Sequence, residues 1–79
     1  MTKLTVEQRR ALATIDNAGP RGATEAVLLA HGFEPQLFID LVRTGLASAR
    51  TEVSRADGQT VEVARIVITP EGRRALAVA

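Results

Sequence analysis

Residues 41–76 read LVRTGLASARTEVSRADGQTVEVARIVITPEGRRAL, and this stretch decides the fold. Its first residues end a helix at Gly45, because glycine accepts the left-handed conformation that commonly follows a helix C-terminus. Two strand-like segments then flank Asp57-Gly58, a dipeptide that strongly favours a two-residue hairpin turn. Thr69-Pro70-Glu71 predicts a last helix, with a capping threonine, a first-turn proline and an early acidic residue. The stretch therefore predicts a helix, a hairpin and a second helix.

A two-residue turn also predicts which residues of the hairpin face each other. Ala56 lies opposite Gln59, and the pairing continues outward from there, with side chains alternating between the two faces. The mostly apolar face, predicted to pack on the helices, has the pairs Ala47–Ile68, Ala49–Ile66 and Thr51–Ala64. The other face has the pairs Arg50–Arg65 and Glu52–Val63.

Three helices are predicted before the hairpin. Thr5 and Gln8 form a capping-box pattern for the first helix, which ends before Gly19-Pro20. Thr24 caps the second helix, and the third covers residues 34–44. The apolar stripes of these elements, and of the hairpin and last helix, predict a core of Leu12, Ile15, Leu28, Phe38, Leu41, Ile66 and Leu76.

Composition narrows the class of protein. The chain has 79 residues, which is the size of one domain, residues 1–79, and 46% of them are hydrophobic. It has no cysteine, so disulfides and thiolate metal sites are excluded and a cytoplasmic location is expected. No signal peptide and no membrane span is expected. The net charge of +1 is low for a dedicated nucleic-acid binder.

The segments LVRTGLAS and ITPEGRRAL resemble winged helix-turn-helix regulators of the MarR and PadR type. The matching residues are Leu41, Gly45 and Leu46, followed by Thr69 and Gly72. The resemblance implies an α+β winged helix: a three-helix core, a two-stranded hairpin wing over residues 47–69 and a C-terminal helix. It also implies DNA binding, with the third helix in the major groove and the wing beside it.

On the third helix, three polar residues are predicted to lie opposite the buried side: Gln36, Asp40 and Arg43. In a DNA-reading helix, Gln36 would contact adenine, and Arg43 would contact guanine or phosphate. Asp40 would repel phosphates, although a carboxylate can accept a hydrogen bond from cytosine. The alternative is a solvated helix face with an Asp40–Arg43 pair.

The hairpin and the start of the second helix add four arginines. Arg50 and Arg65 are predicted to lie side by side, which is destabilising unless a phosphate or Glu52 offsets the repulsion. Arg55 lies near the turn, and Arg21 precedes the second helix, where a DNA backbone contact is expected. The full set of candidate DNA-binding residues is Arg21, Gln36, Asp40, Arg43, Arg50, Arg55 and Arg65.

Two functions remain open. The first is a small DNA-binding, transcription-associated protein that acts through the third helix and the wing. The second is a non-catalytic protein-interaction module, either a homodimer formed through the first and last helices or a binder of another protein, for which an exposed Ile39 is an argument. No catalytic residue, metal or cofactor is expected, because His31 is the only histidine and is assigned to capping or packing.

Overall fold

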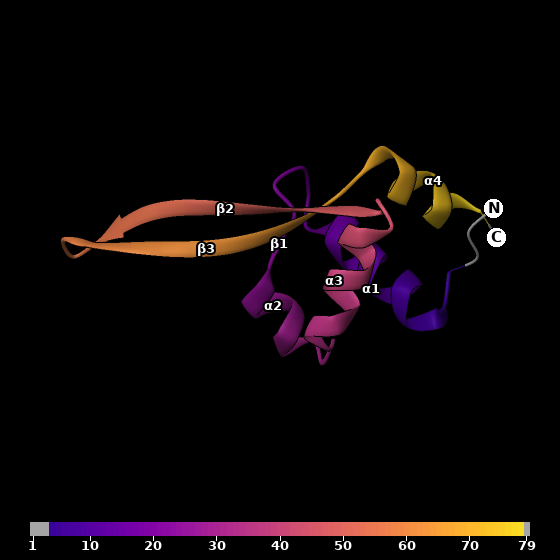
Figure 1. Ribbon diagram of the computed structural model, residues 1–79, viewed down its shortest axis with the longest axis horizontal. Helices are drawn as coiled ribbons and strands as arrows, with labels where there is room; N and C mark the ends of the chain where they lie inside the picture. The colour runs from indigo at the N-terminus through magenta and orange to yellow at the C-terminus, as the bar shows by residue number, and fades with distance from the viewer. Residues whose placement is uncertain (1–3, 79) are drawn as a thin grey trace.

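The computed structural model describes residues 4–78 and shows an α+β fold. The elements of this part of the chain are α1 (Val6–Asn17), β1 (Ala23–Thr24), α2 (Glu25–Ala30), α3 (Pro35–Arg43), β2 (Ala47–Ala56), β3 (Gln59–Ile68) and α4 (Pro70–Ala77). Figure 1 shows the hairpin of β2 and β3 running well past the helices at one end. The molecule is therefore elongated, with extents of 47, 23 and 21 Å.

The predicted helix caps are confirmed. The Thr5 hydroxyl accepts from the backbone N–H of Gln8, and the Gln8 side chain accepts from the N–H of Thr5, which completes the capping box. Thr24 and Thr69 cap α2 and α4 in the same way, through their hydroxyl oxygens. Each cap satisfies a backbone donor that the first turn of a helix leaves without a partner.

The predicted hairpin register is also confirmed, pair by pair from Ala47–Ile68 to Ala56–Gln59. Asp57 and Gly58 both have positive φ, 52° and 76°, as a type I′ turn requires. Arg50 is therefore the direct partner of Arg65. Only the half of the hairpin near the helices packs on them, because Ala47, Ile66 and Ile68 are buried whereas Ala49 and Thr51 are exposed.

The sheet has a third strand that the two-stranded prediction missed. Residues Ala23 and Thr24 form β1 and pair antiparallel with Ile66 and Arg65, so the strand order is β1-β3-β2. Gly22 allows this pairing, because a Cβ at that position would overlap the carbonyl oxygen of Ile66. A two-residue strand is too short to show alternation in a sequence.

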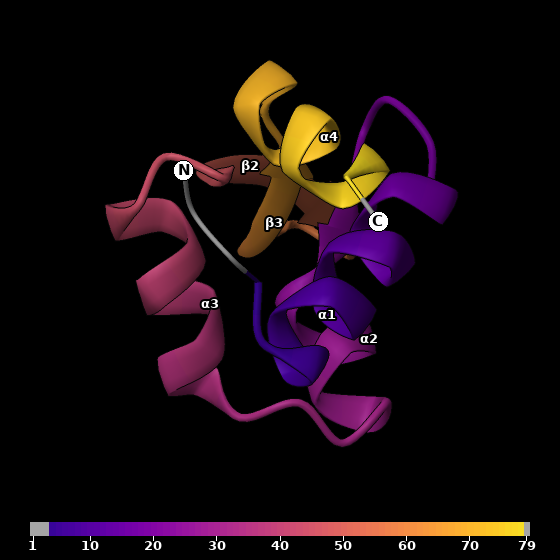
Figure 2. The ribbon, with the colours of Figure 1, turned by 90° about the vertical axis from the view of Figure 1, so that its right-hand side faces the viewer.

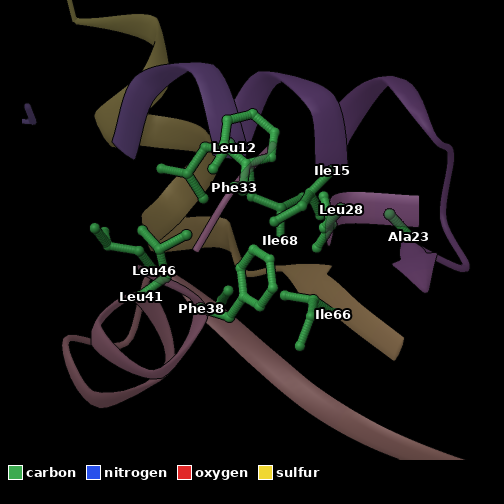
Figure 3. Packing of buried hydrophobic residues seen from close by; sticks show 12 residues of the cluster. Leu12, Ile15, Ala23, Leu28, Phe33, Phe38, Leu41, Leu46, Ile66 and Ile68 are labelled. Carbon is green, nitrogen blue, oxygen red and sulfur yellow. The ribbon is translucent and has the colours of Figure 1, made fainter. Parts of the chain in front are cut away.

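The core lies between the helices and the inner half of the sheet (Figure 3). Six of the seven predicted core residues are buried, and Leu76 is partly buried against the same cluster. Phe33 is also buried, in the connection between α2 and α3, and belongs to the same core cluster (Figure 3). Its place outside any helical stripe explains why periodicity did not identify it.

The first and last helices lie against each other, as the end-on view in Figure 2 shows. Arg9 of α1 donates to the carbonyl oxygens of Leu76 and Val78, both at 3.0 Å. Arg73 of α4 pairs with Asp16 of α1 at 3.3 Å. Within residues 4–78, no helix combines the length and the apolar character that crossing a membrane requires.

Candidate functional site

The two faces of the hairpin carry different chemistry. Ala49, Ala64 and Ile66 line a hollow between the hairpin and α3. Arg50 and Arg65 occupy the neighbouring positions in β2 and β3, and side chains alternate between the faces of a strand. The two arginines therefore lie on the face turned away from α3.

A cluster that we call the arginine face lies on this outer side and consists of Arg21, Arg50, Arg65 and Glu52. Glu52 contacts two of the arginines, with Oε1 3.0 Å from the Nε of Arg65 and Oε2 3.3 Å from an Nη of Arg21. The Nε of Arg65 is buried and its N–H makes no hydrogen bond, so its contact with Glu52 is one of charge. Glu52 thus offsets the predicted Arg50–Arg65 repulsion in part.

Arg50 is the most available cation of the arginine face. Its side chain is exposed, and no acidic group of residues 4–78 lies within ion-pair distance of it. One carboxylate therefore balances three guanidinium groups, which come from the loop before β1 and from both strands of the hairpin. The arginine face has an excess of positive charge, although the whole chain is nearly neutral.

The exposed face of α3 has the opposite charge balance, because acidic side chains gather there. The Gln36 amide donates to the Asp40 carboxylate at 3.1 Å, so Asp40 bonds within the helix to Gln36 and not to Arg43. Glu7 and Glu34 line the same hollow as these two residues. Three carboxylates thus line one hollow with Gln36, and of these only Glu7 has an arginine partner among the described residues, Arg10 at 3.6 Å. A DNA phosphate backbone would be repelled there.

The predicted DNA-binding residues therefore do not form one surface. Arg21, Arg50 and Arg65 lie on the outer side of the hairpin, whereas Gln36, Asp40 and Arg43 lie on α3. Arg55 shares the side of Ala49, because both occupy odd positions of β2, but it lies far along the hairpin towards the turn.

The groove between α3 and the hairpin is a feature that sequence reasoning did not find. It has a volume of about 390 Å³ and is mostly apolar, with Phe38, Ile39, Val42, Ala49, Ala64 and Ile66 in its lining. Glu25 and Arg43 also line it. The exposed Ile39 was the only sequence signal for this groove; its side chain is 49% exposed.

The lone histidine has a structural place. His31 is the C-cap residue of α2, and its ring stacks on Phe33 with 6.4 Å between the ring centroids. Within the described part of the chain, no three histidine, aspartate or glutamate side chains lie close enough together to hold a metal ion.

Comparisons with protein-family models, with curated proteins and with solved structures found no match to this chain. The functional assignment therefore depends on the geometry of the arginine face and of the groove.

Proposed function

We propose that the protein is a winged-helix protein that binds duplex DNA through the arginine face of its hairpin. The order α1-β1-α2-α3-β2-β3 and the strand order β1-β3-β2 support the winged-helix assignment. Fold alone does not define activity, so the DNA contact is argued from the charges. The observation that carries it is the gathering of Arg21, Arg50 and Arg65 around the single carboxylate of Glu52.

The arginine face suits a phosphate backbone better than a base edge. Arg50 is exposed and has no carboxylate partner in the described residues, so it can contact a phosphate without first losing an ion pair. The Arg21–Glu52 pair is exposed, and such pairs contribute at most about 1 kcal/mol, so Arg21 can exchange Glu52 for a phosphate at little cost. Arg65 keeps Glu52 in place. Contacts of this kind position a protein on DNA without selecting a sequence.

The test is fluorescence anisotropy of a labelled duplex over a series of salt concentrations. Each phosphate contact makes the slope of log affinity against log salt more negative by about 0.9. Arg50→Gln and Arg21→Gln should each weaken binding and make the slope less negative by about 0.9, because each removes one phosphate contact. Arg74→Gln on α4 is the matched control, since the Arg74 side chain is as exposed as that of Arg21 and, within residues 4–78, pairs only with Glu71; it should leave the slope unchanged.

The same assay separates this proposal from DNA reading by α3. If α3 entered the major groove, Asp40→Asn would tighten binding by removing a repulsion, and Arg43→Gln would change the preference between sequences. The arginine-face proposal expects neither effect. It fails if no duplex binds at low salt, or if Arg74→Gln weakens binding as much as Arg50→Gln.

A protein-interaction module is the second candidate, and the apolar groove favours it. Monomeric proteins rarely expose a large continuous apolar surface that has no partner. Ile39 and Val42 of α3 are 49% and 36% exposed in the groove. This function does not depend on DNA binding, because the groove and the arginine face lie on opposite sides of the hairpin.

A further inference from the structure

The far half of the hairpin is exposed along its whole length, from Val53 to Glu62. We call residues 53–62 the distal arm; it extends beyond the helices in Figure 1. Val53 and Val61 are 63% and 41% exposed. A two-stranded ribbon with no third strand or helix against it is marginally stable in water. A partner that covered Val53 would therefore stabilise the distal arm.

The accessible surface of the chain is larger than a compact protein of its mass would have. The accessible surface is 5496 Å² for a mass of 8.4 kDa. A compact monomer of this mass is expected to expose about 4,600 Å². The excess of roughly 900 Å² is close to the area of about 800 Å² that each partner buries in a stable protein interface.

We propose that the protein forms a homodimer in which the distal arm of each copy lies in the groove of the other. Val53 projects from the same face of β2 as Ala49, which lines the groove, so Val53 and the groove lie on the same side of the hairpin. Two such surfaces can meet around a two-fold axis, which uses the same patch on both copies. Val53 of each arm would then cover Ile39 and Val42 of the other copy.

The distal arm and the groove each carry one basic and one acidic side chain. Arg55 and Glu62 lie on the same face of the distal arm as Val53, which is the direct partner of Glu62. Glu25 and Arg43 line the groove. In the proposed antiparallel arrangement, Glu62 of one copy would pair with Arg43 of the other, and Arg55 would pair with Glu25. The groove is therefore better suited to a second copy than to a wholly apolar ligand.

The first measurement is the mass of the wild-type chain by analytical ultracentrifugation across the micromolar range. The proposal expects a monomer–dimer equilibrium. A chain that stays monomeric at several hundred micromolar would overturn it, and would leave a different protein as the occupant of the groove.

Charge reversal tests the geometry. Arg43→Glu and Glu62→Arg each place like charges together twice in the dimer, so each should weaken dimerisation at least about tenfold. Both side chains are exposed, so circular dichroism should show folded monomers. An equimolar mixture should regain the wild-type affinity, because both pairs are then opposite in charge. Arg74→Glu on α4 is the control and should leave the dissociation constant unchanged.

Two results would contradict the arm-in-groove arrangement even if a dimer exists. The first is a mixture of the two variants that stays monomeric. The second is a Val53→Asp protein that dimerises as well as wild type, because a carboxylate cannot be buried against Ile39 and Val42 without a large cost. None of these substitutions touches Arg21, Arg50 or Arg65, so the outcome is independent of the DNA-binding test.

Discussion

Thr69 and Gly72 determine how the last helix joins the rest of the molecule. The Thr69 hydroxyl donates to the carbonyl oxygen of Gly45 at 2.6 Å and accepts from the N–H of Gly72 at 3.0 Å. It therefore connects the end of α3 to the start of α4. Gly72 is buried in the first turn of α4, and a Cβ there would overlap the carbonyl oxygen of Leu46. The spacing of Thr69 and Gly72 thus follows from the cap hydrogen bond and from the close packing of Gly72 on the backbone of Leu46.

Gly72→Ala should destabilise the protein by about 2 kcal/mol or more, although alanine favours helices by about 1 kcal/mol over glycine. The cause is overlap of the new methyl group with the backbone at Leu46, which cannot move away easily. Urea unfolding followed by circular dichroism gives the free energy of unfolding. Arg74→Ala, at an exposed position of the same helix, should change it by less than about 0.5 kcal/mol. An unchanged or higher stability of Gly72→Ala would show that the close approach is absent.

Among the elements, α3 has two different sides. Phe38 and Leu41 are 4% and 0% exposed and anchor the helix to the core. Ile39 and Val42 are partly exposed in the groove. The hydrophobic repeat of this helix was predicted to mark one buried face, but its apolar surface is wider than the area the core covers. The uncovered part is the surface that the proposed homodimer would bury.

Replacing Phe38 by alanine should lower the free energy of unfolding by roughly 3–5 kcal/mol, because it removes a buried ring and leaves a cavity. That is a large part of the stability of a small domain. Ile39→Ala is the matched variant on the same helix and should cost under about 1 kcal/mol in the monomer. Chemical denaturation at low protein concentration compares the two. Equal losses would mean that the buried and exposed sides of α3 have been assigned wrongly.

At the scale of the whole molecule, the two ends of the described chain are joined by side chains of α1. Arg9 donates to carbonyl oxygens 67 and 69 residues away, at the C-terminal end of α4. These carbonyl groups have no partner within the helix, and a guanidinium group near a helix C-terminus also interacts favourably with the helix dipole. The sequence suggested a dimer through α1 and α4, but these helices already bond to each other through Arg9 within one chain. The groove beside α3 is exposed to solvent.

Arg9→Gln should lower the free energy of unfolding by about 1 kcal/mol, because two charge-assisted hydrogen bonds are lost at a partly exposed site. Hydrogen exchange should also show faster opening of the α4 amides, since local opening follows the contacts that hold an element. Arg74→Gln, which loses only an exposed pair within α4, is the control. Identical exchange of the α4 amides in wild type and Arg9→Gln would contradict this role.

Most elements of the fold were predictable from local signals. Thr5, Thr24 and Thr69 act through hydrogen bonds to residues three positions away, and Asp57-Gly58 sets its own turn. The alternation on both sides of that turn then determined every pair of the hairpin. The candidate site was less predictable, because the seven proposed residues were chosen by charge and spacing, and the structure separates them onto different surfaces.

The sequence by itself determined the helices, the turn and the register, because caps, turn chemistry and side-chain alternation act over a few residues. Only the tertiary structure decided that Ala23 and Thr24 form a strand, that Glu52 contacts Arg21 from 31 positions away, and that an apolar groove lies beside α3. These features depend on which faces of distant elements meet. That choice is made by burial of the core as a whole, and no short segment of the chain carries the information.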